Sequence, residues 1–231
     1  MTDLKWHRVG ALSGFLFVVM QFVGFGIGGA SRGFERVTLT STDATVTEAT
    51  SEAVPSAVWI GGYVEVLAYL LFVVFAVWLG VALSGYEPAP RWASASVAAA
   101  GLLVVATSFI GYASEAAAYY RAGDGIELGV ARALLDSGNF AYTLAWGGLA
   151  IFLAGAGAVG ARTQAFPRWL VVLALALAAT FLAALALPET AVGEIADLVF
   201  WVWVISVTIA LIRRGPAPVA APVRQAAGPA F

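Results

Sequence analysis

The chain lacks most of the residues on which several membrane chemistries depend. It has no cysteine in 231 residues, one histidine, His7, and one lysine, Lys5. The missing cysteines exclude disulfides, thiolate metal sites and a cysteine nucleophile. One histidine cannot supply bis-histidine haem ligation, a histidine-rich di-metal centre or an HExxH protease, and no lysine lies inside an apolar segment to form a retinal Schiff base. We therefore expect no cofactor and no metal.

Charge is also scarce. Only 11% of residues are charged and 61% are hydrophobic, and the mean hydropathy is +0.89. The net charge is −2, and no basic patch is dense enough for nucleic acid, so a nucleic-acid partner is not expected.

Six apolar segments account for this composition. A helix needs about 20 apolar residues to cross a bilayer, and runs of this length with almost no charge are typical of membrane spans. The segments are Val9–Gly29, Trp59–Leu83, Ala93–Ser114, Phe140–Gly160, Trp169–Leu187 and Leu198–Ile212. They predict an all-α polytopic membrane protein with one domain over residues 1–214 and a disordered Pro/Ala-rich tail over 215–231. The first segment is longer than the apolar region of a signal peptide, so we expect it to be retained.

Basic residues are distributed unequally between the two sets of loops. One set, together with both termini, holds eight of the twelve: Lys5, Arg8, Arg91, Arg162, Arg168, Arg213, Arg214 and Arg224. The other set holds four basic residues, Arg32, Arg36, Arg121 and Arg132, and carries or adjoins twelve of the fourteen acids. The positive-inside rule then predicts that both termini are cytoplasmic.

The three predicted cytoplasmic entries share a basic residue followed by tryptophan. They are Lys5-Trp6, Pro90-Arg91-Trp92 and Pro167-Arg168-Trp169. The pattern fits an ordinary basic and aromatic interface. It also fits three consecutive helical hairpins in the same orientation, which is the architecture we predict.

The outer loops carry their own signals. Residues 32–56 are rich in threonine and predict a solvated loop or a loose surface helix. Asp124 followed by Glu127 is typical of a helix start, and Ile126–Leu135 alternates at helical spacing. The run Asp136–Asn139 predicts a break between this short interfacial helix and the fourth span.

Small and polar residues inside the spans predict contacts between helices. Small residues four apart occur in three rows: Gly10 with Gly14, Gly24 with Gly28, and Ala150 with Ala154 and Ala158. Such rows let backbones approach closely, so we interpret them as intramolecular seams. Gln21, at mid-span, is expected to hydrogen-bond to a neighbouring helix.

Polar groups recur near the outer ends of four spans. Glu65 interrupts an apolar run about 18 residues from Leu83, or roughly 27 Å along the helix. The candidate site residues at similar depth are Glu65, Glu115, Arg132, Asp136, Asn139, Glu194 and Asp197. They either line one acidic vestibule for a cation or an amine, with Arg132 as the basic partner, or form a hydrated rim at the headgroups. The tyrosines, including Tyr69 and Tyr142, are interpreted as belt or packing aromatics.

The C-terminal half resembles a known family. Phe140–Leu170, a Gly/Ala-rich span ending in Phe166-Pro167-Arg168-Trp169-Leu170, is similar to bacterial six-span proteins of domain-of-unknown-function family 4386. The later run with Leu187-Pro188, Glu194, Trp201, Trp203 and Gly215 is similar to the last span of that family. The resemblance implies a six-helix integral membrane protein of unestablished activity, located in a bacterial inner membrane. It carries over no catalytic residue.

Two classes of function follow from these features. The first is a non-enzymatic membrane protein that binds a small cationic ligand, a lipid or a partner at the outer vestibule. The second is a small transporter or channel subunit for a cation or cationic solute. An enzyme is not favoured, because Ser13 and Ser108 lack a histidine or lysine base. The lipid bilayer is the expected partner in either case.

Overall fold

The computed structural model describes residues 2–31, 33, 36–88, 90–187 and 190–214. The predicted Pro/Ala-rich tail therefore lies outside the described residues. Regular structure in the described residues consists of α-helices. The helices are α1 (Thr2–Ser31), α2 (Asp43–Ser51), α3 (Ser56–Ser84), α4 (Trp92–Tyr120), α5 (Leu128–Thr163), α6 (Arg168–Ala186) and α7 (Val192–Arg214).

Six of these helices, all except α2, are long and apolar enough to cross a membrane. The predicted all-α fold with six spans is confirmed. Each span also exposes large apolar side chains around the outside of the bundle, among them Phe25, Val81, Ile110, Val172 and Val202. A surface of this kind is stable in hydrocarbon, where exposed apolar side chains cost nothing.

The six spans form a closed ring in chain order. Each span packs on the next, and α7 returns to pack on α1. The α1–α7 closure includes the rings of Phe22 and Trp201, whose centroids are 4.6 Å apart. At the other end, His7 Nε2 lies 3.3 Å from the carbonyl oxygen of Leu211. The histidine thus links the first and last helices.

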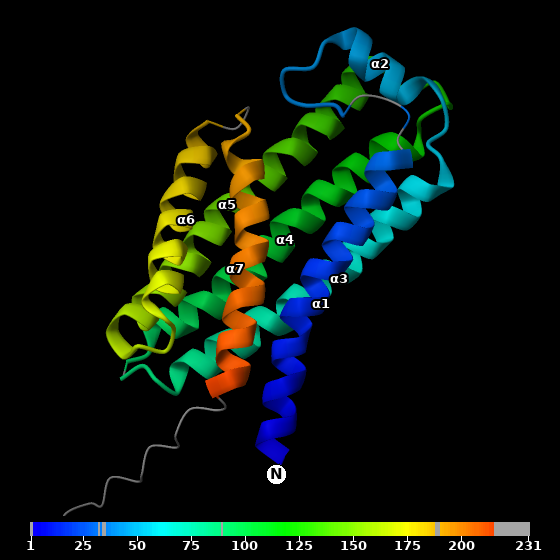
Figure 1. The fold of residues 1–231 in the computed structure, drawn as a ribbon. Coiled ribbons are helices and arrows are strands. Elements are labelled where there is room, and N and C mark those ends of the chain that lie inside the picture. The colour runs from blue at the N-terminus through cyan, green and yellow to red at the C-terminus, as the bar shows by residue number, and fades with distance from the viewer. Residues whose placement is uncertain (1, 32, 34–35, 89, 188–189, 215–231) are drawn as a thin grey trace, which may run out of the picture.

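The two ends of the bundle differ. The helix α2 lies over one end, beside the start of α5 (Figure 1), and packs on that helix. The start of α1 and the end of α7 lie at the opposite end (Figure 1). We call these the α2 end and the terminal end. Which end faces the cytoplasm stays a prediction from the distribution of basic residues.

The predicted break at Asp136–Asn139 is wrong, because α5 is one helix across Gly138. Gly138 lies against α4, where an added Cβ would be 2.8 Å from Cγ of Glu115, so the glycine serves helix packing. The Asn139 amide nitrogen donates to the carbonyl of Leu135, within the same helix, at 3.1 Å. The glycine and the asparagine are thereby accommodated inside a helix. The 36 residues of α5 extend about 54 Å.

The predicted helix start at Asp124 is also displaced. The helix α5 begins at Leu128, and its N-cap residue, Glu127, makes no side-chain capping hydrogen bond. The predicted short interfacial helix is therefore the beginning of the long helix α5. Helix α2 packs against α5.

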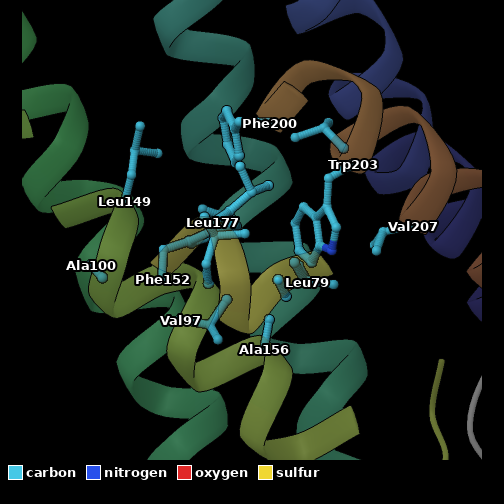
Figure 2. Close-up of a cluster of buried hydrophobic side chains, with 14 of the residues drawn as sticks. Leu79, Val97, Ala100, Leu149, Phe152, Ala156, Leu177, Phe200, Trp203 and Val207 are labelled. Atoms are coloured by element: carbon cyan, nitrogen blue, oxygen red, sulfur yellow. The ribbon is translucent and has the colours of Figure 1, made fainter. Parts of the chain in front are cut away.

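Aromatic side chains fill the interior of the ring. Figure 2 shows Phe152, Phe200 and Trp203 among the buried aliphatic residues. The Phe72 ring on α3 lies 5.5 Å from Phe152 on α5 and 6.0 Å from Phe200 on α7. Buried Trp203 also donates from Nε1 to the carbonyl of Leu170 at 3.1 Å, which links α7 to α6. Alternate spans thus meet through their side chains at the centre.

The contact of α1 with α3 is a seam of small residues, as predicted for Gly24 and Gly28. A Cβ added at Gly61 on α3 would lie 2.5 Å from the Gly28 nitrogen and 2.8 Å from the Gly24 carbonyl oxygen. The backbones therefore approach too closely for any side chain at Gly61. The predicted alanine row on α5 does not form such a seam, because Ala154 is exposed.

Gly61→Ala should destabilise the protein by about 1–3 kcal/mol, because the new methyl group must push α1 and α3 apart. Thermal unfolding of the purified protein measures this effect. Gly29→Ala is the matched control, since an added Cβ there meets nothing within 4 Å. We expect the control to be neutral or slightly stabilising, through helix propensity. Equal losses in both variants would contradict the seam.

A buried glutamate in the preceding loop caps the start of α4. The N-cap residue Arg91 makes no side-chain capping bond, and Glu87, 6% exposed, replaces it. Its two carboxylate oxygens accept hydrogen bonds from the amides of Ala93, at 3.2 Å, and Ser94, at 2.8 Å. Burial raises the pKa of Glu87, but hydrogen bonds from Ser94 and Ala93 outweigh burial and hold the pKa below its usual value.

The stabilisation from Glu87 should therefore depend on pH. Because the folded protein holds the carboxylate ionised, the contribution is present above about pH 4.3, the pKa of an unfolded glutamate, and is lost as the pH falls through the lower folded value. Glu87→Gln should lower stability by about 1 kcal/mol at pH 7. Melting temperatures of both proteins should converge towards low pH, whereas a constant difference would contradict the cap.

Candidate functional site

Three of the predicted acids lie near two tyrosines in the part of the bundle towards its α2 end. The Tyr69 side chain on α3 interacts electrostatically with Glu65 and with Asp197 of α7. The Tyr142 side chain on α5 interacts with Glu115 of α4 and with Glu65. We call these five residues the carboxylate–tyrosine cluster. Glu65 and Tyr69 lie on α3, Tyr142 on α5 and Asp197 on α7, which are alternate spans of the ring. Glu115 lies on α4, between α3 and α5.

Helix spacing and glycine contacts place the two glutamates. Glu65 and Tyr69 are four residues apart and share one face of α3. A Cβ added at Gly24 on α1 would lie 2.7 Å from Cγ of Glu65, so the glutamate stem crosses over this glycine. The Glu115 stem lies over Gly138 of α5 in the same way. Small residues on neighbouring helices thus leave room for both half-buried side chains.

Asp197 is fixed by α5. Its Oδ2 accepts a hydrogen bond of 3.3 Å from Nε1 of Trp146. The indole lies over Gly193, one turn before the aspartate, where an added Cβ would overlap the ring. The tryptophan therefore holds the carboxylate in place while leaving its second oxygen for other groups.

A row of polar groups continues from Tyr69 into the bundle. The Tyr69 side chain interacts with Ser108 on α4 and with Gln21 on α1. Both partners are buried, with exposures of 2% for Ser108 and 7% for Gln21. The predicted interaction of Gln21 with a neighbouring helix is confirmed. A polar row shared by three helices fixes their relative rotation, because each group needs its partner.

Arg36 is the basic residue beside the cluster, and the sequence did not single it out. It forms an exposed ion pair with Glu194 at 3.2 Å and interacts electrostatically with Asp197 and Tyr142. Glu194 therefore lies at the rim of the cluster. An exposed pair of this kind contributes little stability, about 0–1 kcal/mol.

Arg132 and Asn139 serve a different purpose from the predicted one. Arg132 pairs with Asp43 at 2.8 Å and donates to the carbonyl of Ser41 at 2.8 Å. The Asn139 amide donates to the carbonyl of Val37 at 3.2 Å. These side chains of α5 anchor the segment that contains α2. Arg132 is consequently not the partner of the cluster acids.

Asp136 is the remaining predicted residue. Its Oδ1 is buried and has no hydrogen-bond partner among the described residues. Asp136 is not among the described groups that interact with Tyr69 and Tyr142, so it is not part of the carboxylate–tyrosine cluster.

The cluster offers acceptors and aromatic faces. Within the described part of the chain, no group of three or more His, Asp or Glu residues could hold a metal ion. The chemistry available is therefore hydrogen bonding and charge attraction towards a small cationic group. The sequence analysis interpreted Tyr69 and Tyr142 as packing aromatics and did not predict them as site residues. The spacing of Tyr69 four residues after Glu65 was the one signal that could have found it.

No protein-family model matches this chain, and neither does any curated protein or any solved structure. The resemblance to domain-of-unknown-function family 4386 accordingly stays a prediction.

Arg132→Gln should loosen the α2 segment without unfolding the bundle. Loss of the charge-assisted bonds to Asp43 and Ser41 should cost about 1 kcal/mol locally, which is about fivefold faster amide hydrogen exchange in α2. Hydrogen exchange with mass spectrometry measures this rate. Arg121→Gln removes the same charge from a side chain that lies over the Tyr120 ring, and it should leave α2 unchanged. Unaltered exchange in both variants would contradict the anchor.

Proposed function

We propose that this protein is a non-enzymatic integral membrane protein that binds a small cationic ligand at the carboxylate–tyrosine cluster. The observation that carries the proposal is the sharing of two tyrosines by carboxylates from three helices. The orientation, with the α2 end outside and both termini in the cytoplasm, belongs to the same proposal and rests on the eight-to-four distribution of basic residues. The proposed location in a bacterial inner membrane rests on the family resemblance alone.

Charge balance supports a cationic ligand. Glu65, Glu115 and Asp197 bring three acids to one region, whereas the adjacent base, Arg36, is paired with Glu194. Neighbouring half-buried carboxylates repel one another, and a cation between them weakens this repulsion. A bound cation would remove this repulsion.

The aromatic rings favour an organic amine over a metal ion. Tyrosine faces attract ammonium groups with about 0.5–2 kcal/mol, depending on desolvation. The lack of a metal-holding group among the described residues points the same way. Primary amines and polyamines are therefore the first ligands to test.

Binding is favoured over transport by what lies deeper in the bundle. Transporter sites near the bilayer midplane are typically built from broken helices, and each of the six spans is continuous in the described residues. Beyond Tyr69, the interior contains the fully buried rings of Phe72, Phe75 and Phe152. The polar row that ends at Gln21 would be the start of a path for the alternative function, a transporter of cationic solutes.

Amine binding should raise the melting temperature of the purified protein. At a ligand concentration of 100 Kd the gain is about 2.7 kcal/mol, which corresponds to a shift of several degrees. Glu65→Gln should reduce this shift strongly, because it removes the carboxylate that both tyrosines share. Glu48→Gln, on the exposed face of α2, should leave it intact.

Two further arms make the measurement specific. Magnesium chloride and sodium chloride at equal ionic strength show how much of any shift comes from screening alone. A neutral alcohol of the same size as the amine tests the need for positive charge. The proposal fails if no amine raises the melting temperature above the salt controls. It also fails if Glu65→Gln retains the full shift.

A further inference from the structure

A groove of about 540 Å³ opens at the terminal end, far from the carboxylate–tyrosine cluster. Its walls come from the start of α6 and the last turns of α7. The lining residues are Pro167, Trp169, Leu170, Ser206, Ile209, Ala210, Arg213 and Arg214.

The groove combines apolar walls with a basic rim. Leu170, Ile209 and Ala210 line the part that runs along the spans. At its mouth, Arg213 and Arg214 are exposed, and Trp169 is 56% exposed. Within the described residues neither arginine forms an ion pair with an acid. Two cationic side chains therefore border an apolar groove without neutralisation.

Hydrogen bonding keeps one of these arginines at the mouth. Nη1 of Arg214 donates to the carbonyl of Gln164, in the connection between α5 and α6. Guanidinium groups carry five N–H donors, so most of the donors of Arg214 stay available. The indole of Trp169 is of the type that lies at headgroup depth. The mouth of the groove thus has the composition of a membrane interface.

We propose that this groove binds one anionic phospholipid. The headgroup phosphate lies between Arg213 and Arg214, since guanidinium groups bind phosphate through paired hydrogen bonds. An acyl chain follows the wall formed by Ser206, Ile209 and Ala210. Basic pockets between spans are a physically favoured site for acidic headgroups.

The length of the wall favours a lipid over a free phosphate. Ser206 and Arg213 are seven residues apart on α7, which is about 10 Å along the helix axis, and both line the groove. A phosphate ion could contact only the rim, whereas an acyl chain can cover the whole wall. A second groove, of about 360 Å³ and lined by Met20, Leu67, Leu70, Leu71 and Val74, has no charged residue. It offers nothing to select a headgroup.

Native mass spectrometry of the full chain in detergent tests the proposal with two lipids of identical acyl chains, phosphatidylglycerol and phosphatidylcholine. We expect phosphatidylglycerol to bind more tightly by about tenfold or more, because its net negative charge lies beside two arginines, whereas the choline group cancels the phosphate charge of the other lipid. Arg213→Gln/Arg214→Gln should abolish this preference. Equal binding of both lipids to the unmodified protein would overturn the proposal.

Two control variants separate the groove from charge in general. Arg91→Gln/Arg162→Gln removes the same charge from exposed positions at the terminal end outside the groove, and it should keep the preference. Ser206→Phe fills the wall without changing charge and should weaken binding of both lipids. If the Arg91/Arg162 variant loses as much as the Arg213/Arg214 variant, or if Ser206→Phe changes nothing, the groove is not the site.

A third arm identifies the source of the phosphate group. Inorganic phosphate at millimolar concentration should not displace bound phosphatidylglycerol, because it lacks the acyl contacts. Full displacement would overturn the lipid assignment and favour a soluble anion. The outcome is independent of the amine measurement, since the two sites lie at opposite ends of the bundle and no groove residue belongs to the cluster.

Discussion

Aromatic packing at the centre of the ring is the constraint on which the other features of this bundle depend. Water provides no driving force for helix association within a bilayer, so complementary packing must hold the spans together. Phe72, Phe152, Phe200 and Trp203 provide it, with ring centroids about 6 Å apart across α3, α5 and α7. These spans are not neighbours in the ring, and each still needs the others to fill the interior.

This central packing moves polar chemistry towards the ends of the bundle. A carboxylate among the aromatic rings would lose its hydration without gaining a partner, at a cost of several kcal/mol. The acids of α3, α4 and α7 accordingly lie towards the α2 end, where tyrosine and tryptophan side chains meet them. The basic groove lies at the other end. The α2 end is thus acidic and the terminal end basic, with an apolar interior between them.

The errors of sequence interpretation have a common physical origin. Asp136–Asn139 is typical of a helix break, yet Gly138 is used for packing against α4 and Asn139 bonds back to Leu135. Arg132 is the nearest base along α5 to several acids, yet its side chain turns to Asp43. For Gly138 and for Arg132, a partner distant in sequence decides which of two local preferences is satisfied. Local propensity cannot contain that information.

The sequence by itself determined the number of spans, the all-α class and the close approach at Gly24 and Gly28, because these depend on apolar length and on side-chain size along one helix. It also placed Glu65, Glu115 and Asp197 near the same end of the bundle, since position along a helix axis is a count of residues. Only the tertiary structure decided which side chains meet. Closing the ring sets the rotation of each span. That rotation brought Tyr69 and Tyr142 near Glu65 and paired Arg132 with Asp43 of α2.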